Sequence, residues 1–574
     1  MKRRVSLAVH LLVMVPALIV TLTCCSSDEG PLPVSEPAPL EPEISHEYGS
    51  CEPNNAPFPE RPPPRYEATL PFLKVREMQI LDENDNPVAL RGINFGSWLM
   101  MENWIPGIGR ETVDEFRSRF VAKVVELGLK PLIDEATART IVHYLVRDVP
   151  IWSIYKSWID YAIDHAASPQ QRQKAEQLWE WFDNEPWIYE ERNLWRYFVK
   201  RFGWAKMELL RNTFQDNFIT ELDVQRASEM GFTLIRVPVW YEALETDYKN
   251  EENFFKPEGW RRLDNLLDWA RKHRVYIMID LHGAPGGQNG YWHMGLAEGG
   301  DLWERPECIA KTARLWGAIA NYFRDEPHVA VYDLLNEPNT VPSKKKFIAV
   351  YDAIYREIRK YDTRHIIGLT DGFVGPERIA TPKEMGWEPD CCIMQGHYYP
   401  GYAGVPTESA EDYRDSIEND LVDYARRFRL LYRFKMPLFA GEFNAAVGGE
   451  GQPWAAEGMG LVLDMMNRRG VHWAPWTWKY YRPGSTWGVY HPREPLHPEI
   501  TCTDSPIYQA VIGPTAIIGQ DDCYQIDVTA EFEEILADFK KLNSVNYVPS
   551  LPAYYQALVH NAKAPFATTP NLWP

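Results

Sequence analysis

The sequence has no surplus of positive charge, no apparent internal repeat and no Cys or His pair at the spacing of metal ligands. Its 60 Lys and Arg residues stand against 80 Asp and Glu residues, which gives a formal net charge of −20. Such a chain has too few cations to neutralise phosphates, so we exclude nucleic acid and anionic membrane surfaces as partners. The histidines are scattered and no Cys or His pair has zinc-ligand spacing, so we expect neither a metal nor another cofactor.

The N-terminus has the pattern of an export signal. Basic residues at positions 2–4 precede an apolar stretch, 5–20, that is too short for a comfortable membrane span. The following Leu-Thr-Cys-Cys resembles a bacterial lipoprotein processing box, so we expect a signal peptide over 1–25 and a lipid anchor on Cys25 or Cys24. An ordinary secretory signal is the alternative. Either signal predicts an exported protein, at the cell surface or outer membrane or secreted.

Proline and acidic residues dominate the next segment, 26–66, which predicts a disordered tether before a large folded domain over 67–574. Disulfides can form in an exported protein. Six further cysteines are available: Cys51, Cys308, Cys391, Cys392, Cys502 and Cys523. We prefer the pair Cys502–Cys523, which shares one late loop, although spacing alone also allows all six to be free.

Eight short apolar segments, most of them followed by amphipathic stretches, predict a (β/α)8 barrel. The strand segments are Ala89–Asn94, Thr233–Val237, Tyr276–Leu281, Val329–Leu334, Ile366–Thr370, Cys392–Gly396, Pro437–Glu442 and His472–Thr477. Apolar residues recur at helical spacing over 260–273 and 308–323. Before the first barrel strand, residues 82–86 predict a turn between two short strands that close the bottom of the barrel.

Two insertions interrupt this pattern. The first, at about 109–204 between strands one and two, is far longer than a usual connection and rich in Trp and Tyr. We expect a helical subdomain whose aromatic residues form a core of its own; a lid that supplies rings for sugar stacking is the alternative. The second is a long irregular loop, 482–526, after strand eight.

Polar residues follow most of the predicted strands, and the C-terminal strand ends of such a barrel meet at one mouth. Strand four leads into Asn336-Glu337-Pro338 and strand seven ends at Glu442. Glycoside cleavage needs two carboxyl groups, one to protonate the leaving oxygen and one to attack the anomeric carbon or activate water. A lone Glu would more often be a surface charge, but two at strand ends favour catalysis.

The sequence resembles glycoside hydrolase family 5, and within it the fungal exo-β-1,3-glucanases. The resemblance covers about 73–478 except the first insertion. It rests on the segments 90–99 (Leu-Arg-Gly-Ile-Asn-Phe-Gly-Ser-Trp-Leu), 102–105 (Glu-Asn-Trp-Ile), 217–221 (Asn-Phe-Ile-Thr-Glu) and 280–290 (Asp-Leu-His-Gly-Ala-Pro-Gly-Gly-Gln-Asn-Gly), together with Asn-Glu-Pro at 336–338.

The resemblance implies a retaining enzyme with Glu337 as acid/base and Glu442 as nucleophile. Arg236 and Tyr399 would donate hydrogen bonds to Glu442, and Asn336 would hold the sugar 2-hydroxyl. Further substrate-binding positions implied are Glu102, His282, Asn289, His397 and, as the floor of the subsite, Trp478. Taken alone, His282 or His397 would more often be a buried structural histidine.

Three positions depart from the fungal pattern. Tyr291 and Tyr402 match two Phe at the pocket entrance of the fungal enzymes, and His293 stands where they have Asn. The first insertion is also absent from them. These departures leave the linkage preference and exo-action open, while the two catalytic carboxylates are kept.

We therefore expect an exported enzyme that hydrolyses a β-linked oligo- or polysaccharide, of the exo-β-1,3-glucanase type. An endo-acting family 5 enzyme on another β-glucan, β-mannan or glycolipid is the alternative within enzymes. From other classes, a non-catalytic sugar-binding lipoprotein or a surface adhesin would use the same barrel as a scaffold. Because both Glu residues are present, the catalytic interpretation is favoured.

Overall fold

The computed structural model describes residues 51, 54–108, 113–134, 151–184, 191–246, 254–289, 291–295, 299–370, 376–388, 390–399, 415, 435–445, 455–498 and 522–568. The chain divides into two units, Met1–His46 and Glu47–Pro574, and the first unit lies outside these described ranges. The expected export signal with Cys24 and Cys25 therefore also lies outside them.

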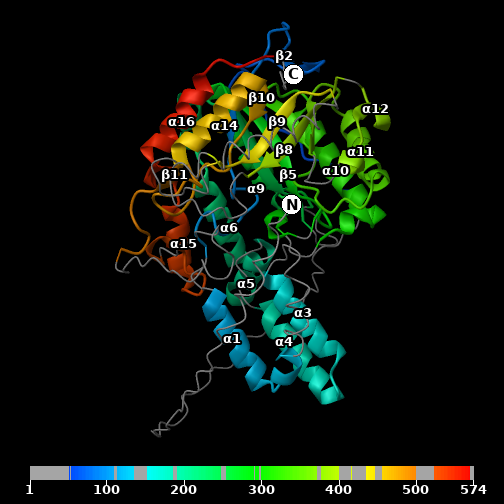
Figure 1. Cartoon of the computed structure of the whole chain (residues 1–574), viewed down its shortest axis with the longest axis vertical. Helices are drawn as coiled ribbons and strands as arrows, with labels where there is room; N and C mark the ends of the chain where they lie inside the picture. The colour runs from blue at the N-terminus through cyan, green and yellow to red at the C-terminus, as the bar shows by residue number, and fades with distance from the viewer. Residues whose placement is uncertain are drawn as a thin grey trace, which may run out of the picture. The chain divides into compact units, whose positions relative to one another are not determined.

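Eight parallel strands form the barrel, with helices packed around them (Figure 1). In chain order they are β3 (Gly92–Asn94), β4 (Leu234–Trp240), β5 (Tyr276–Gly283), β6 (Val329–Asp333), β7 (Ile366–Thr370), β8 (Cys392–Tyr398), β9 (Leu438–Phe443) and β10 (Val471–Trp473). Each strand pairs with its neighbours in sequence. A parallel bridge between Arg91 and Trp473 joins the first strand to the last, so the predicted (β/α)8 class is confirmed.

The strands form because their residues can be buried on both faces. All seven residues of β4 and all eight of β5 are buried, as expected for parallel strands enclosed by helices. All eight predicted segments contain or overlap an observed strand, and β7 has the predicted bounds. The first and the last are much shorter than predicted: β3 begins only at Gly92, and the chain leaves the sheet after Trp473.

Amphipathic helices cover the outside of the sheet. They are α6 (Trp204–Phe218), α7 (Glu221–Met230), α8 (Tyr241–Leu244), α9 (Pro257–His273), α10 (Pro306–Phe323), α11 (Lys344–Arg359), α12 (Pro382–Met385), α14 (Ala455–Arg469), α15 (Phe532–Lys541) and α16 (Pro552–Lys563). The two predicted helical stretches fall inside α9 and α10. Neighbouring pairs such as α10 with α11 and α14 with α16 lie side by side (Figure 1). A two-stranded sheet joins β11 (Tyr490–Pro492) to β12 (Tyr547–Pro549).

A small hairpin closes the N-terminal end of the barrel, as predicted. β1 (Leu73–Arg76) pairs with β2 (Gln79–Asp82), and their apolar side chains share a core with inward-facing residues of the barrel strands. The expected turn at 82–86 is present, but it follows β2 and leads to a bridge between Leu81 and Pro87. The residues that join the two strands are Glu77 and Met78.

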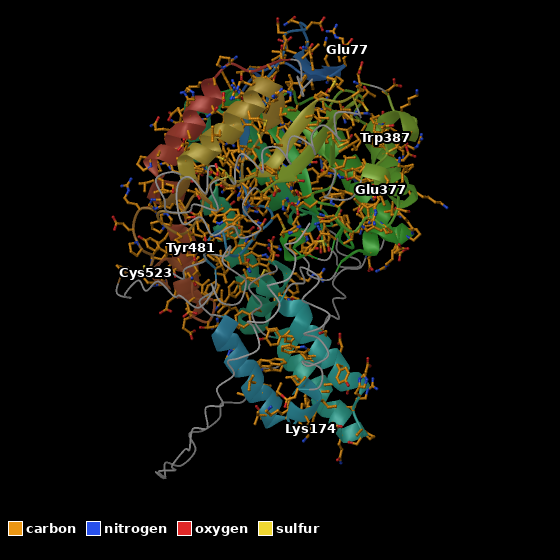
Figure 2. All side chains as sticks on the ribbon, in the orientation of Figure 1. Glu77, Lys174, Glu377, Trp387, Tyr481 and Cys523 are labelled. Carbon is orange, nitrogen blue, oxygen red and sulfur yellow. A yellow bond between two sulfur atoms is a disulfide. The ribbon has the colours of Figure 1, made fainter. Side chains whose placement is uncertain are left out.

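The first insertion is helical and has its own core. Helices α1 (Val113–Glu126), α3 (Ile151–Asp164) and α4 (Pro169–Asn184) direct side chains into the space between them (Figure 2). Their cluster includes Tyr155 and Phe182, with partly buried Trp158, Trp179 and Trp181 packed against it. Helix α5 (Glu191–Phe202) is different, because its Trp195 belongs to the core of the barrel. The separate core therefore ends before the predicted boundary at 204.

The expected tether is partly built into the barrel. Cys51 forms a disulfide with Cys308, at the start of α10, and Arg61 forms ion pairs with Asp264 and Glu326. The prediction of disorder is therefore wrong for the end of the 26–66 segment, because these charged and sulfur contacts were not visible in its composition. None of the helices in the described ranges combines the length and apolar character that a bilayer span requires.

The remaining cysteines divide into two kinds. Cys523 is disulfide-bonded, and its expected partner, Cys502, lies outside the described residues. Cys391 and Cys392 are free thiols at the start of β8, with their sulfur atoms 2.9 Å apart. The alternative that all six cysteines are free is therefore wrong.

Candidate active site

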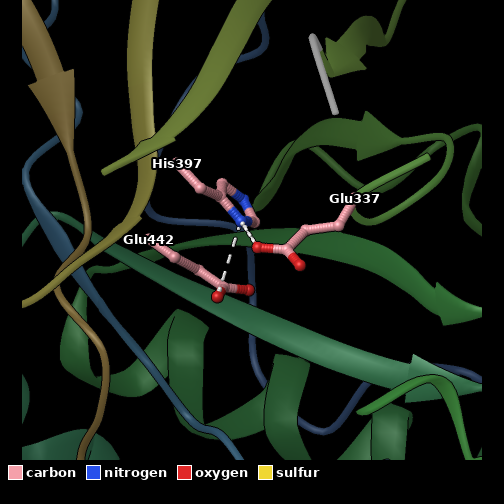
Figure 3. A group of neighbouring side chains, drawn as sticks. All are labelled: Glu337, His397 and Glu442. Atoms are coloured by element: carbon pink, nitrogen blue, oxygen red, sulfur yellow. Dashed lines mark hydrogen bonds and ion pairs between the residues drawn. The ribbon is translucent and has the colours of Figure 1, made fainter. Parts of the chain in front are cut away.

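Two carboxyl groups face each other at the C-terminal mouth of the barrel. Glu442 lies in β9, and Glu337 follows β6 in a loop where its φ is +37°, a conformation that long side chains rarely adopt. One oxygen of Glu337, one of Glu442 and a nitrogen of His397 all lie within 4.8 Å of one another (Figure 3). At least one pair of their oxygens is therefore closer than the roughly 6.5–9.5 Å that separates the carboxyl groups of inverting glycosidases.

Two donors hold the Glu442 carboxylate. Arg236 donates from Nη1 to Oε1 at 2.8 Å, and the hydroxyl of Tyr399 donates to Oε2 at 2.9 Å. Burial and the neighbouring carboxylate raise the pKa of Tyr399 well above its usual range, so its hydroxyl remains a donor. Both oxygens of Glu442 are therefore held by hydrogen bonds, from the two donors that the resemblance implied.

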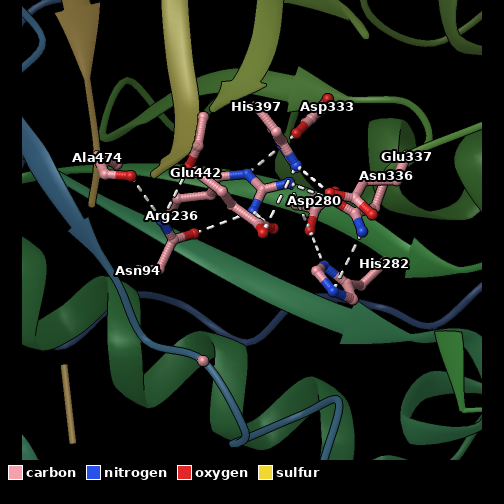
Figure 4. A network of polar contacts seen from close by, with 12 residues as sticks. Asn94, Arg236, Asp280, His282, Asp333, Asn336, Glu337, His397, Glu442 and Ala474 are labelled. Carbon is pink, nitrogen blue, oxygen red and sulfur yellow. Dashed lines mark hydrogen bonds and ion pairs between the residues drawn. The ribbon is translucent and has the colours of Figure 1, made fainter. Parts of the chain in front are cut away.

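Arg236 is the centre of a buried polar network (Figure 4). It donates to Asn94 Oδ1 at 2.9 Å, to Asn336 Oδ1 at 2.8 Å and to Asp333 Oδ2 at 3.2 Å, and its Nη2 lies 3.0 Å from Asp280 Oδ2. Burial opposes the charge of Arg236, but the three carboxylates around it outweigh burial and raise its pKa. The guanidinium therefore stays charged, and it links Glu442 to side chains on β3, β5 and β6.

Asp280 and Asp333 form a coupled carboxyl pair beneath this guanidinium. They are partners in the register between β5 and β6, and both are fully buried. Burial, together with the Asp280 carboxylate, raises the pKa of Asp333 to about 8. The pKa of Asp280 is lowered: burial opposes its charge, but Arg236 outweighs burial. Within the described part of the chain, Asp280 Oδ1 has no hydrogen-bond partner.

Glu337 is held by two histidines, one at each carboxyl oxygen. Nδ1 of His397 lies 2.7 Å from Oε1, and Nε2 of His293 lies 3.2 Å from Oε2. Burial lowers the pKa of His397 to about 3 and that of His293 to about 4, so both rings are neutral at ordinary pH. His397 was among the predicted site residues. His293 was singled out only as a departure from a family pattern.

His282 forms the neighbouring wall of the site. Its Nδ1 lies 2.6 Å from Asp280 Oδ2 and its Nε2 lies 3.8 Å from Glu102 Oε1. Burial disfavours its charged form, but the Asp280 carboxylate outweighs burial and raises the pKa of His282 to about 10. Burial also raises the pKa of Glu102, whose other oxygen accepts a hydrogen bond from Trp104 Nε1 at 2.8 Å.

The predicted asparagines and tyrosines lie in different surroundings. Asn336 bridges Arg236 and His282, whose Nε2 lies 3.2 Å from its Nδ2. Asn289 is fully buried, and its Nδ2 donates to the main-chain oxygen of Glu337 at 2.9 Å, so it supports the catalytic loop. The ring of Tyr291 stacks on His293, with centroids 5.6 Å apart at 13°. Tyr402, its expected partner at the entrance, lies outside the described residues.

The structure does not place Trp478 at the site. Its side chain is fully buried, its Nε1 donates to Asp223 at 2.8 Å, and its ring packs beside Phe95 and Tyr490. Trp476 is instead stacked on His282, with ring centroids 5.7 Å apart at 15°. The prediction chose the wrong member of the Trp-Thr-Trp segment. Residues two apart share one face of a regular strand, but the backbone is irregular after β10, so only one of the two rings faces the site.

One group of side chains in the described ranges, Glu337, His397 and Glu442, brings three metal-ligating atoms close together. Hydrogen bonds with Arg236 and Tyr399, and between His397 and Glu337, already use these atoms. The arrangement, at the mouth of a (β/α)8 barrel, can support acid–base and nucleophilic chemistry.

Known proteins of this class match the chain. A family model described as cellulase, glycosyl hydrolase family 5, matches residues 197–482 of this chain. A β-xylosidase of Phanerodontia chrysosporium is 33% identical over 36% of this chain and 43% of its own length. A probable glucan 1,3-β-glucosidase A of Aspergillus fumigatus is 32% identical over 40% of this chain and 53% of its own. The chain thus spans about half the length of these curated relatives.

Among solved structures, endo-glycoceramidase II from Rhodococcus sp. superposes with a TM-score of 0.38 and 18% identity, over 48% of this chain and 70% of that one.

Proposed function

We propose that this protein is a retaining β-glycoside hydrolase that cleaves β-glucan in the manner of an exo-β-1,3-glucanase. The observation that carries the proposal is the close approach of Glu337 and Glu442, with the latter held by Arg236 and Tyr399. The match to glucan 1,3-β-glucosidases supports the substrate class.

The geometry supports a double displacement. Glu442 attacks the anomeric carbon while Glu337 gives its proton to the leaving oxygen, which leaves a glycosyl ester on Glu442. Glu337, now a carboxylate, then takes a proton from the water that attacks this ester. The product keeps its anomeric configuration and both residues return to their starting states.

Two substitutions test the assigned roles. Glu442→Ala should abolish turnover, and azide should restore activity with an α-glycosyl azide as product, because the small anion fills the vacated space. Glu337→Ala should retain far more activity on an aryl glucoside with an excellent leaving group, which needs no protonation in the first step. If both variants lose activity equally on that substrate, the role assignment is wrong.

The anomeric configuration of the first product tests retention, and the size of the early products tests exo-action. NMR of a β-glucoside reaction should show the β-anomer first, and early products from laminarin should be glucose alone. Release of the α-anomer would contradict retention. Early release of mixed oligomers would instead support the endo-acting alternative.

We also propose that the protein is exported and anchored through lipid on Cys25 or Cys24. The disulfide between Cys51 and Cys308 supports an oxidising compartment. Metabolic labelling with a radioactive fatty acid should mark the wild-type protein but not a variant with both cysteines changed to Ser. Equal labelling of both proteins, or none, would contradict the anchor.

A further inference from the structure

The loop after β5 packs directly against the disulfide that joins the pre-barrel segment to α10. A Cβ built on Gly286 of this loop would lie 2.6 Å from Cys308 Sγ and 3.1 Å from Cys51 Sγ. Gly286 has a φ of +74°, and both cysteines are fully buried. Because a side chain at this position would meet the sulfur atoms, glycine is what allows the loop to approach the disulfide so closely.

The pre-barrel segment is held along α10 by further contacts. Arg314 of α10 donates to two of its main-chain oxygens, those of Asn54 and Ala56. The guanidinium of Arg61 lies over the ring of Phe323, at the far end of the same helix. Among these contacts, the disulfide is the one that lies against the loop after β5.

The same loop holds the backbone of the acid/base. The buried side chain of Gln288 donates from Nε2 to the main-chain oxygen of His282 at 2.6 Å and to that of Asn336 at 2.9 Å. Its neighbour Asn289 donates to the main-chain oxygen of Glu337 at 2.9 Å. Two consecutive side chains of the loop therefore hold two consecutive carbonyl groups after β6.

Glu337 depends on this support because its backbone is strained. Its φ of +37° is unfavourable for a residue with a long side chain. Such a conformation persists only where the surrounding contacts over-determine it. The hydrogen bonds from Gln288 and Asn289 are contacts of this kind, so a shift of the loop would displace the carboxyl group of Glu337.

We propose that the disulfide between Cys51 and Cys308 positions the acid/base: the disulfide fixes the loop after β5, and the loop fixes Glu337. The two cysteines act through Gln288 and Asn289 and are positioning residues. This inference rests on the proposed glycosidase function. It gives the segment before the barrel, expected from its composition to be a tether, a part in the reaction.

The double variant Cys51→Ser/Cys308→Ser opens the link without leaving an unpaired thiol. A displaced acid/base slows the step that needs its proton, so kcat/KM should fall by roughly tenfold or more on a glucoside with a poor leaving group. On a dinitrophenyl glucoside, which needs no proton in the first step, the loss should stay below about threefold. A loss of folded protein would lower both values by the same factor, so the ratio of the two separates positioning from stability.

Two further variants sharpen this comparison. Arg61→Ala is the matched control, because it loosens the same segment at the opposite end of α10 from Cys308, and its ratio should equal that of the wild type. Gly286→Ala keeps both cysteines, but its methyl group would meet both sulfur atoms and displace the loop, so it should show the same unequal loss even if the double variant does not fold. An unchanged ratio in the double variant or in Gly286→Ala, or an equal change in Arg61→Ala, would overturn the inference.

A second measurement does not depend on activity. The amides of Gly287 and Asn339 are hydrogen-bonded within the two loops. In hydrogen exchange of the folded full-length protein, peptides that cover 284–289 and 336–339 should exchange faster in the double variant than in the wild type or Arg61→Ala. Unchanged exchange in these peptides would overturn the inference. If exchange rises as expected but the wild type hydrolyses no β-glycoside, the proposed function fails and the link from the disulfide to the two loops stands.

Discussion

The buried pair Asp280 and Asp333 allows us to predict how the free energy of unfolding depends on pH. Asp333 has a pKa of about 8 in the folded protein because it is fully buried beside the Asp280 carboxylate. In the unfolded chain an Asp titrates near about 3.9. Between these values the folded state holds one proton more than the unfolded state, so this group makes the free energy of unfolding fall as pH rises.

The magnitude follows from the linkage relation. One extra proton in the folded state changes the free energy of unfolding by about 1.4 kcal/mol per pH unit. Summed from about pH 4 to pH 8, this amounts to on the order of 5 kcal/mol, an upper bound because Arg236, Thr370 and Gln395 all donate to Asp333 and favour its charged form. Asp333→Asn resembles the protonated form at every pH, so it removes the contribution of this group to the pH dependence of the free energy of unfolding.

The assay is thermal unfolding of the wild type and Asp333→Asn at pH 5.5, 6.5 and 7.5. The variant should gain stability relative to the wild type at each step towards higher pH. Asp82→Asn is the control, because Asp82 is only half-buried and its lowered pKa keeps it ionised in both states over this range, so its effect should be constant. If the difference between Asp333→Asn and the wild type is also constant, Asp333 holds no proton and the reasoning is wrong.

Three further substitutions have distinct expected outcomes. Cys308→Ser opens the link to Cys51 across 257 residues and should lower the free energy of unfolding by roughly 2–5 kcal/mol, measured by denaturant unfolding of the oxidised proteins. Under reducing conditions, which also open the disulfide of Cys523, the variant and the wild type should match, and a difference that persists there would contradict the role of this link. Trp476→Ala should reduce kcat/KM at least tenfold. Trp478→Phe should mainly lower the free energy of unfolding, by about 1 kcal/mol, because it removes a hydrogen bond. The reverse result would support Trp478 as the floor of the subsite. Tyr291→Ala should raise KM for laminari-oligosaccharides more than KM for a small aryl glucoside, and equal increases would contradict an entrance role.

The sequence alone determined the barrel and the positions of its two central carboxylates. Segments such as Ile366–Thr370 are buried on both faces. A short apolar run between turns is the sequence pattern of such a strand, so these segments could be identified without tertiary contacts. Parallel strands bring their C-terminal ends to one mouth, so Glu337 and Glu442 could be placed together without knowledge of any other contact.

The tertiary structure decided everything that depends on contacts between distant segments or on irregular backbone. Cys51 meets Cys308 because the segment before the barrel packs along α9 and α10, which its composition does not reveal. Trp476 replaces Trp478 at the wall of the site because the chain turns after β10. His293 reaches Glu337 only because two loops from different strands converge, and no local pattern encodes such a meeting.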